Sequence, residues 1–502
     1  MKPVLSKKEA TLADFLSIER NYISQDRLMD NAGMLSAQFF VENIKDPFNQ
    51  KVLIIAGKGN NGGDAIIMHH YLLHYGVDSS LLAMNSENKR LLKKYKILKK
   101  YRIEKINKKS ICRYDWIVDG IFGIGLNRKI TGKYKEIIQI LGGQDIISLD
   151  IPSGLACDTG NPISSDIFIK PKYVISMGFY KYGNLINKSK QVFKRTKILD
   201  IGFPKISKLI NDIRVHTIEK ADVKSIIKDD NFLRHKYSGL CSMLVGSREY
   251  SGAGVLAVLG ALKSGASYSR VAVPGKIASL YSNILESVDL PIGNREYFSG
   301  SDYRVIIKSD LLSKNAPILI GPGLGAKKGT TQLTSKLLDY LSDKENSCVL
   351  DASGFEPLYE SKEIKDLPKN CILTPHLGEF KKIFPDIQSE NLLKSHKKIM
   401  QRLDKRVLIL KGPSTFIFTT TGRVYVLNNG NSLLATAGSG DVLSGIILGL
   451  LAKGYKSDEA SILGVYVHGL CSHNYIKKTS RHSMCAKDII KILPQCFNEV
   501  YK

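Results

Sequence analysis

Short apolar runs, each followed by glycine or an acidic residue, alternate with helical stretches along this chain. Residues 51–56 read Lys-Val-Leu-Ile-Ile-Ala and lead directly into glycine-rich sequence. A continuous apolar run of this length is typical of a strand buried on both faces of a parallel sheet. Similar runs at 116–119, 145–150 and 174–177 repeat the plan. The pattern predicts an α/β fold of doubly wound sheets, whose ligands bind outside the carboxyl ends of the strands.

A second alternating series follows the first, and 502 residues are too many for one ordinary core. Residues 203–235 are charged and show no clear strand, so we place the domain junction near 212–225. We expect two three-layer αβα domains, residues 1–215 and 222–502. The strands predicted for the second domain are 242–245, 270–273, 317–320, 348–350, 371–373 and 407–410, with long helices from Asp441 onwards.

The chain is strongly basic, with 73 lysine and arginine residues against 47 acidic ones, or +26. No run of five or more basic residues occurs, so we interpret the lysines as solvated surface and expect no nucleic-acid partner. The eight cysteines form no CxxC pair, which suits reduced thiols in the cytoplasm. The N-terminus lacks the apolar core of a signal peptide, and no stretch approaches the length of a membrane span, so we expect a cytoplasmic protein without a membrane partner.

The densest motif in the first half is the glycine-rich run from Gly57 to Asp64, between a predicted strand and a predicted helix. Glycines let the backbone approach a ligand, and the first turn of a helix offers free N–H groups to phosphate. Gly57, Gly59 and Gly62 match the dinucleotide fingerprint, but that match alone is weak, and a plain glycine turn explains it equally well.

Two further polar loops follow predicted strands. The first runs from Asp119 to Arg128 and the second from Asp150 to Gly160, so each begins with a carboxylate. A single aspartate at a strand end is often only a turn former. Three polar loops at one sheet edge favour a shared site instead.

In order and spacing, GKGNNGGD, DGIFGIGLNRKITG and LDIPSGLACDTG resemble the NAD(P)H-hydrate epimerases, over roughly residues 5–205. The resemblance implies a Rossmann-like domain in which Asp150 is the acid/base and Asn61, Asp119 and Ser153 bind a potassium ion. Ala65 and Asp30 depart from the family pattern, where glycine and glutamate are expected. The residues implied to hold the hydrated cofactor are Asn60, Asn61, Gly62, Gly63, Asp64, Gly123, Ile124, Gly125, Leu126, Asn127, Arg128, Lys129 and Asp150.

The most telling motif in the second half is Thr436-Ala-Gly-Ser-Gly-Asp441, just before a predicted helix. Small residues at a helix start form an anion-binding nest, and Asp441 is placed to accept a hydroxyl proton. Taken singly, Asp441 can be a helix cap, His376 a loop histidine and Glu379 a first-turn carboxylate. Together with the 321–325 and 411–415 loops, they favour a site for phosphoryl transfer.

Residues 225–500, with LTPHLGEF, VLILKGPST and the block ending in ATAGSGD, resemble the ribokinase-like ADP/ATP-dependent NAD(P)H-hydrate dehydratases. The resemblance implies that Asp441 activates the substrate hydroxyl and that ADP, or ATP, acts with Mg²⁺. Departures from the family pattern are Ser432-Leu-Leu434 and Ser353-Gly354. The implied contacts are Ala253, Gly325, His376 and Asp441 for the hydrated cofactor, and Lys411, Gly412, Pro413, Ser414, Thr415 and Gly440 for the nucleotide.

These resemblances predict a bifunctional repair enzyme: the first domain epimerises hydrated NADH and NADPH, and the second dehydrates the S hydrate. We also expect a homo-oligomer. One alternative makes the second domain a kinase for a vitamin-precursor alcohol, and another makes the first an RNA- or protein-binding scaffold. A hydride-transferring dehydrogenase is the least favoured, because the glycine loop continues into Asn-Asn-Gly-Gly-Asp.

Overall fold

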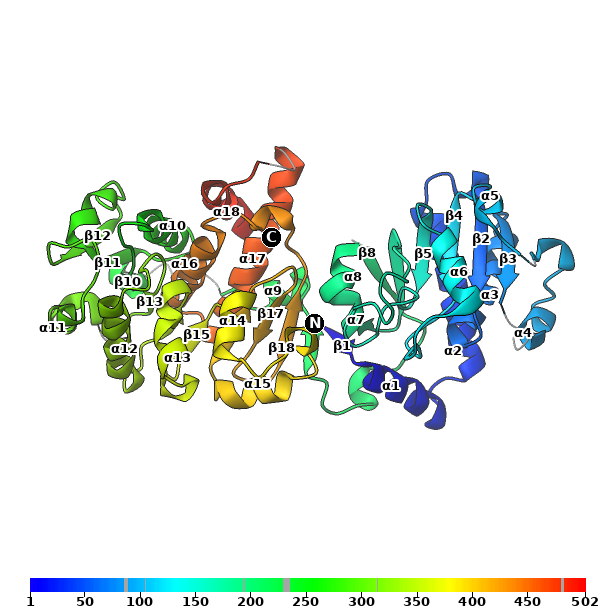
Figure 1. Ribbon diagram of the computed structural model, residues 1–502, viewed down its shortest axis with the longest axis horizontal. Helices are drawn as coiled ribbons and strands as arrows, with labels where there is room; N and C mark the ends of the chain where they lie inside the picture. Colours follow the sequence, from blue (N-terminus) through cyan, green and yellow to red (C-terminus); the bar gives the residue numbers. More distant parts are fainter. Residues whose placement is uncertain (85–88, 104, 193–194, 229–234, 314, 480–482) are drawn as a thin grey trace. The chain divides into compact units, whose positions relative to one another are not determined.

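The computed structural model describes residues 1–84, 89–103, 105–192, 195–228, 235–313, 315–479 and 483–502. The chain forms two compact units, residues 2–215 and 216–502, and each is described by itself (Figure 1). No helix among the described residues combines the length and the apolar character that crossing a membrane requires.

The first unit alternates strands and helices, as predicted. Its strands are β1 (Lys2–Leu5), β2 (Lys51–Ala56), β3 (Asp78–Ala83), β4 (Trp116–Gly120), β5 (Asp145–Leu149), β6 (Tyr173–Met177), β7 (Tyr180–Lys181) and β8 (Arg195–Leu199). Its α-helices are α1 (Lys7–Glu19), α2 (Gln25–Asn43), α3 (Asn60–His74), α4 (Lys89–Lys94), α5 (Lys108–Ile111), α6 (Gly132–Ile140), α7 (Tyr182–Leu185) and α8 (Asn187–Val192).

Six parallel strands form the central sheet in the order β3-β2-β4-β5-β6-β8. The chain winds outward from β2 in both directions, so β2 and β4 flank the topological switch point. Ligands of open parallel sheets bind at such a point, outside the strand carboxyl ends. The glycine-rich run that starts at Gly57 follows β2, and the loop that runs to Arg128 follows β4. Both were singled out in the sequence.

Alternate side chains of β2 pack against helices on opposite faces of the sheet, which gives three layers: helices, sheet and helices. Val52, Ile54 and Ala56 pack in a core with α2 and α3, while Leu53 and Ile55 pack in a second core with α5 and α6. Successive strand residues point to opposite faces, so a fully apolar strand must be covered on both. The predicted αβα architecture is confirmed for this unit.

The second unit continues the alternation. Its strands are β10 (Leu240–Leu244), β11 (Tyr268–Pro274), β12 (Ser287–Ile292), β13 (Ile318–Ile320), β14 (Cys348–Leu350), β15 (Cys371–Leu373), β16 (Val407–Leu410), β17 (Thr415–Phe418) and β18 (Val424–Leu427). Its α-helices are α9 (Lys220–Lys224), α10 (Ser251–Leu262), α11 (Tyr303–Lys308), α12 (Lys328–Ser342), α13 (Glu356–Glu360), α14 (Leu377–Ile383), α15 (His396–Leu403), α16 (Ser439–Ala452), α17 (Ser457–Lys478) and α18 (Ala486–Tyr501).

The sheet of this unit runs β12-β11-β10-β13-β14-β15-β16-β17-β18. Strands β10 to β16 are parallel, with the switch point between β10 and β13, whereas β17 and β18 are antiparallel additions. The sequence did not predict this antiparallel extension. Residues 411–414 are too few for a parallel crossover, so β17 must turn back along β16.

The helices predicted from Asp441 onwards are confirmed as α16, α17 and α18, which form one core with alternate strand residues such as Leu319 and Val349. The prediction of no strand in 203–235 is wrong at β9 (Val215–Thr217), a short β-branched segment. Residues 229–234 of that range lie outside the described residues.

Candidate active sites

The first candidate site begins where β2 ends and α3 starts. Gly59 is the N-cap residue of α3, so Asn60 and Asn61 begin the first turn, the part of a helix whose backbone N–H groups can bind an anion, while the Gly62 N–H donates to the Gly59 carbonyl at 3.0 Å. A Cβ at Gly62 would lie 2.1 Å from the carbonyl oxygen of Gly57. The loop therefore packs tightly enough to exclude any side chain at Gly62.

We expect Gly62→Ala to destabilise this unit by about 2 kcal/mol, because the new methyl group must displace the Gly57 carbonyl. Trp116, the only tryptophan, lies buried in β4 and reports unfolding of this unit by its fluorescence in urea. Gly59→Ala is the matched control, because nothing lies within 4 Å of its built Cβ. Equal losses in the two variants would contradict the crowding argument.

Asp119, Ser153 and Asn61 come together around the peptide of Phe122. The fully buried Asp119 accepts hydrogen bonds from Ser153 Oγ at 2.6 Å and from Ser153 N at 2.9 Å. The Ser153 hydroxyl accepts the Phe122 N–H at 2.9 Å, and Asn61 Nδ2 donates to the Phe122 carbonyl at 2.9 Å. Burial raises the pKa of Asp119, partly offset by its hydrogen bonds from Ser153 and Ser148.

The donor set of this group fits a potassium ion. Asn61 Oδ1 is buried and has no hydrogen-bond partner, which leaves one oxygen free for a cation. Carboxylate, amide and hydroxyl oxygens are the ligands that hard cations prefer. Among the described residues, no group of three or more His, Cys, Asp and Glu side chains could hold a metal ion.

Asp150 directly follows β5 in the left-handed backbone region, with φ of 64°. Its Oδ1 accepts hydrogen bonds from the Lys181 ammonium and, at 3.2 Å, from Met177 N. Lys181 is only 3% exposed and also donates to the Met177 carbonyl at 2.8 Å. The Asn184 side chain contacts the backbone of both residues of this ion pair. It donates to the Asp150 carbonyl at 3.1 Å and accepts the Lys181 backbone N–H at 2.8 Å.

The carboxyl groups of Asp64 and Asp14 also interact electrostatically with the Asp150–Lys181 ion pair. Burial raises the pKa of Asp64 well above its usual value, and Asp150 and Asp14 raise it further. Sequence reasoning singled out Asp64 and Asp150 but missed Lys181 and Asp14, which lie on short or distant elements without a recognisable motif.

The 123–129 loop lies beside this group. A Cβ at Gly123 would lie 3.2 Å from the Cβ of Asn61, so this end of the loop closes on the α3 terminus. Ile124 is half-buried against the apolar clusters beneath the loop, as is Leu126, whereas Arg128 and Lys129 are exposed. The structure thus brings the start of the predicted loop to the site and leaves its basic end at the surface.

The second candidate site lies at the start of α16. Gly438 caps the helix in the left-handed region, with φ of 86°, and Asp441 is its third residue. Lys411, just after β16, forms an ion pair with the buried Asp351 after β14, with 2.8 Å between Nζ and Oδ1. A Cβ at Gly440 would lie 3.2 Å from the Lys411 ammonium nitrogen. Lys411, its partner Asp351 and the start of α16, which carries Asp441, therefore lie close together.

The electrostatics of this point suit proton and phosphoryl transfer. Burial, with a contribution from Asp351, raises the pKa of Asp441 to about 7. Burial alone would lower the pKa of Lys411, but Asp351 and Glu379 outweigh it and raise that pKa. Burial also raises the pKa of Glu379. A base that titrates near neutrality beside a fixed cation is typical of an active site.

His376 and Glu379 lie next to Lys411. His376 is the N-cap of α14, and its backbone N–H donates to Glu379 Oε2 at 2.7 Å. Its segment pairs with the start of the 411–415 loop, where Lys411 N donates to the Pro375 carbonyl at 2.9 Å. Within that loop, Gly412 and Pro413 are exposed, Ser414 is buried and Thr415 begins β17.

Ala253 and Gly325 lie at the switch point between β10 and β13. A Cβ at Gly323 would lie 3.1 Å from the Ala253 Cβ, and one at Gly325 would lie 3.6 Å from Ser247 Oγ. The Ser247 hydroxyl is buried without a hydrogen-bond partner, so it is available to form a hydrogen bond with a ligand. Sequence reasoning missed Ser247, which carries no signal beyond its place after a strand.

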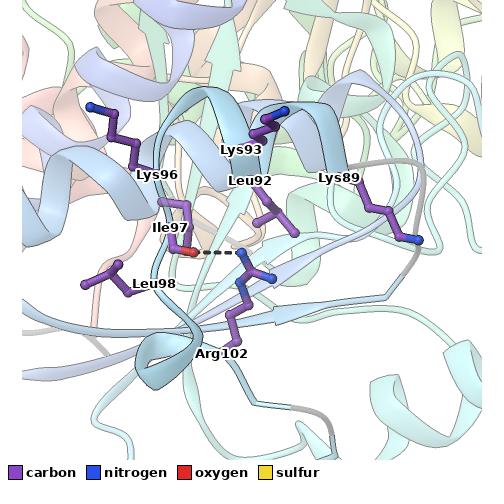
Figure 2. Close-up of a pocket in the computed structure, with 7 residues that line it drawn as sticks. All are labelled: Lys89, Leu92, Lys93, Lys96, Ile97, Leu98 and Arg102. Atoms are coloured by element: carbon purple, nitrogen blue, oxygen red, sulfur yellow. Dashed lines mark hydrogen bonds between the residues drawn. The ribbon is translucent and has the colours of Figure 1, made fainter.

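Two surface hollows are lined by residues other than those predicted for the candidate sites. One has a volume of about 380 Å³ and is lined by lysines of α4 and by Arg102, which donates to the Ile97 carbonyl at 2.7 Å. Figure 2 shows these side chains. The other, of about 590 Å³, is lined by residues between 358 and 404. Neither is lined by a predicted site residue.

Comparison with known families accounts for both units. The family model described as NAD(P)H-hydrate dehydratase matches residues 241–495, and the one described as YjeF-related protein N-terminus matches residues 25–183. The bifunctional NAD(P)H-hydrate repair enzyme Nnr of Dictyoglomus turgidum is 33% identical over 100% of this chain and 99% of its own length. The chain belongs to the bifunctional NAD(P)H-hydrate repair enzymes.

The Thermofilum pendens repair enzyme is 28% identical over 97% of this chain and 94% of its own length. Among solved structures, the ADP/ATP-dependent NAD(P)H-hydrate dehydratase of Bacillus subtilis, co-crystallised with ATP and Mg²⁺, is 26% identical. It covers 56% of this chain and 97% of its own, with a TM-score of 0.48.

Proposed function

We propose that the first unit interconverts the R and S hydrates of NADH and NADPH, and that the second dehydrates the S hydrate with an adenine nucleotide. Family membership over the whole chain supports both activities. The observation that carries the proposal is the meeting of Asp441, Lys411 and the α16 terminus.

In the dehydratase site, Asp441 takes the proton from the substrate hydroxyl as that oxygen attacks the terminal phosphoryl group of the nucleotide. The free N–H groups at the start of α16 and the Lys411 ammonium stabilise the phosphate charge. The phosphorylated oxygen then leaves as phosphate with the electrons of the carbon–oxygen bond, a proton passes from the neighbouring ring carbon to water, and the electrons of that carbon–hydrogen bond form the ring double bond. The phosphates of ADP or ATP, rather than a set of protein carboxylates, would hold Mg²⁺ here, and the ion would offset the phosphate charge.

In the epimerase site, the α3 terminus binds the substrate phosphates and Asp150, held by Lys181, transfers protons at the damaged ring. Asn61, Asp119 and Ser153 would hold a potassium ion, which would supply positive charge to the site. This role rests on the free Asn61 oxygen and on the buried Asp119 carboxylate.

The proposal predicts a definite pH dependence for dehydration. Asp441 acts as a base only when ionised, and its pKa is raised to about 7. The value of kcat/KM should therefore fall about tenfold for each pH unit below that pKa and level off above it. Initial rates at low substrate concentration across this range provide the measurement. A profile that is flat through neutrality contradicts the assignment of Asp441 as the base.

The test of the activity is recovery of dihydronicotinamide absorbance when the purified chain meets mixed epimers, ADP or ATP, and Mg²⁺. Full recovery with release of free phosphate supports the proposal. Stable phosphorylated product from a vitamin-precursor alcohol would indicate the kinase alternative instead. Salt-sensitive RNA binding without any cofactor turnover would indicate the scaffold alternative.

A further inference from the structure

Helices α10 and α16 lie side by side in the second unit and run in the same direction. A Cβ at Gly438, the N-cap of α16, would lie 2.4 Å from Leu256 Cδ1 in the first half of α10. Further along both helices, a Cβ at Gly449 would lie 2.3 Å from the Ala261 carbonyl oxygen. These contacts advance toward the C-terminus of each helix, so the two helix starts lie at the same end. The positive ends of two helix dipoles are thus neighbours, and the dehydratase chemistry described so far uses only that of α16.

The start of α10 packs against the loop that follows β13. The N-cap residue of α10 is Tyr250, and a Cβ at Gly323 would lie 2.3 Å from the Tyr250 carbonyl oxygen. The Ala253 N–H donates to the same carbonyl at 3.2 Å. Within the part of the chain that the structure describes, the N–H groups of Ser251 and Gly252 have no acceptor, as is usual in the first turn of a helix. Two backbone donors therefore remain for a ligand beside this loop.

The Ser247 hydroxyl faces the same loop. Its side chain is 0% exposed, and its oxygen has no hydrogen-bond partner among the described residues. Apart from the chain neighbours of Gly325, this oxygen is the only described atom within 4 Å of a Cβ built at that glycine, so the space on that side of the loop opens on the hydroxyl. The Gly246 N–H donates to the Pro322 carbonyl at 2.9 Å, which holds the segment of Ser247 against the loop. A buried hydroxyl without a partner destabilises a folded protein, and in this position a ligand oxygen can supply the partner.

We propose that the start of α10 and Ser247 bind the pyrophosphate of the hydrated cofactor, while the start of α16 binds the phosphoryl group that the nucleotide transfers. The inference rests on the proposed dehydratase activity and deepens it, because it assigns a separate helix start to the phosphates of each substrate. The reaction brings a dinucleotide and a second nucleotide into one site, and their phosphates repel each other. Two neighbouring helix starts offset the charge of both.

The groups at the start of α10 fit pyrophosphate better than the damaged ring. The N–H groups of Ser251 and Gly252 and the hydroxyl of Ser247 can all donate hydrogen bonds, and phosphate oxygens accept them. Gly323 and Gly325 have φ of 71° and 72°, in the left-handed region that favours glycine. Without side chains at these two positions, a phosphate can approach the backbone of the loop closely.

The test is Ser247→Ala in the full chain, with Ser269→Ala as the matched control. Ser269 is also 0% exposed and its hydroxyl also lacks a described partner, but it is the second residue of β11, away from the strand carboxyl ends. In dehydration of the S hydrate, we expect Ser247→Ala to raise the KM for the hydrate about tenfold, the loss of one hydrogen bond to a charged group. The values of kcat and of the KM for the nucleotide should not change, and Ser269→Ala should keep all three wild-type values.

A substrate without phosphates separates a phosphate contact from a ring contact. Hydrated dihydronicotinamide riboside keeps the damaged ring but has no pyrophosphate, so wild type and Ser247→Ala should use it with equal kcat/KM. A tenfold loss with the riboside as well would place the hydroxyl on the ring or the ribose and overturn the assignment. A raised KM for the nucleotide in place of the hydrate would overturn it too, because the start of α10 would then bind the phosphates of the nucleotide.

Folding and function are separated by two further readouts. Removal of an unpaired hydroxyl leaves no new group without a partner, so the Tm of Ser247→Ala from circular dichroism should be no lower than that of wild type. A wild-type KM for the hydrate in Ser247→Ala overturns the inference and leaves the proposed function intact. A wild-type chain that does not dehydrate the S hydrate with ADP or ATP overturns both.

Discussion

Asp441→Asn should lower kcat for nucleotide-dependent dehydration about 1000-fold, because an amide keeps the shape of the carboxyl but cannot accept the hydroxyl proton. Its position as the third residue of α16 makes a second role possible, since a carboxylate there also stabilises the helix start. That contribution of a carboxylate to the helix start is worth about 0.3 to 2 kcal/mol and acts on stability, not on kcat.

Asp488→Asn is the matched control for this prediction. Asp488 is the third residue of α18 and accepts the Cys485 N–H at 3.0 Å, a capping role at another helix start. We expect this control to keep wild-type kcat, and Asp441→Asn to keep wild-type epimerase activity. Similar kcat in the two variants would mean that Asp441 only caps its helix.

Lys181→Met should lower the free energy of unfolding of the first unit by about 3 to 5 kcal/mol, because it leaves the Asp150 carboxylate without its buried partner. The two side chains are only 4% and 13% exposed, so water replaces the lost ammonium poorly. Urea unfolding followed by Trp116 fluorescence measures the loss. Epimerase activity should fall as well, since Lys181 holds Asp150 in place.

The double variant Lys181→Met with Asp150→Asn separates pairing from packing. With both charges removed, no carboxylate remains buried alone, so more than half of the lost stability should return. Its epimerase activity should stay low because the base is absent. A double variant as unstable as Lys181→Met would show that the lysine acts through packing alone.

The strand, glycine loop and helix around residues 51–74 could be predicted from sequence because each step has a local cause. The apolar run of β2 forms a doubly covered strand, and the glycines up to Gly62 permit the close turn before α3. The apolar runs of β13 to β16 were predicted for the same reason. The αβα architecture of the first unit follows from these local patterns.

The partners of the predicted acids could not be predicted in the same way. Lys181 reaches Asp150 from 31 positions along the chain, and Lys411 reaches Asp351 from 60. Such pairs depend on which strands become neighbours in the sheet, and one lysine among the 73 basic residues carries no local sign of burial. Strand β1 is likewise placed by a distant pairing, in which Leu5 lies beside Lys181.

The most direct measurement supplies the purified chain with the pure R hydrate of NADH, an adenine nucleotide and Mg²⁺. Dihydronicotinamide absorbance should return completely if, as we propose, epimerisation at Asp150 feeds dehydration at Asp441 within one chain. Asp150→Asn should slow that recovery to the spontaneous rate of epimerisation while still consuming the S hydrate at the normal rate. If the wild-type chain leaves the R hydrate unchanged, or recovers it no faster than Asp150→Asn, one chain does not carry both activities.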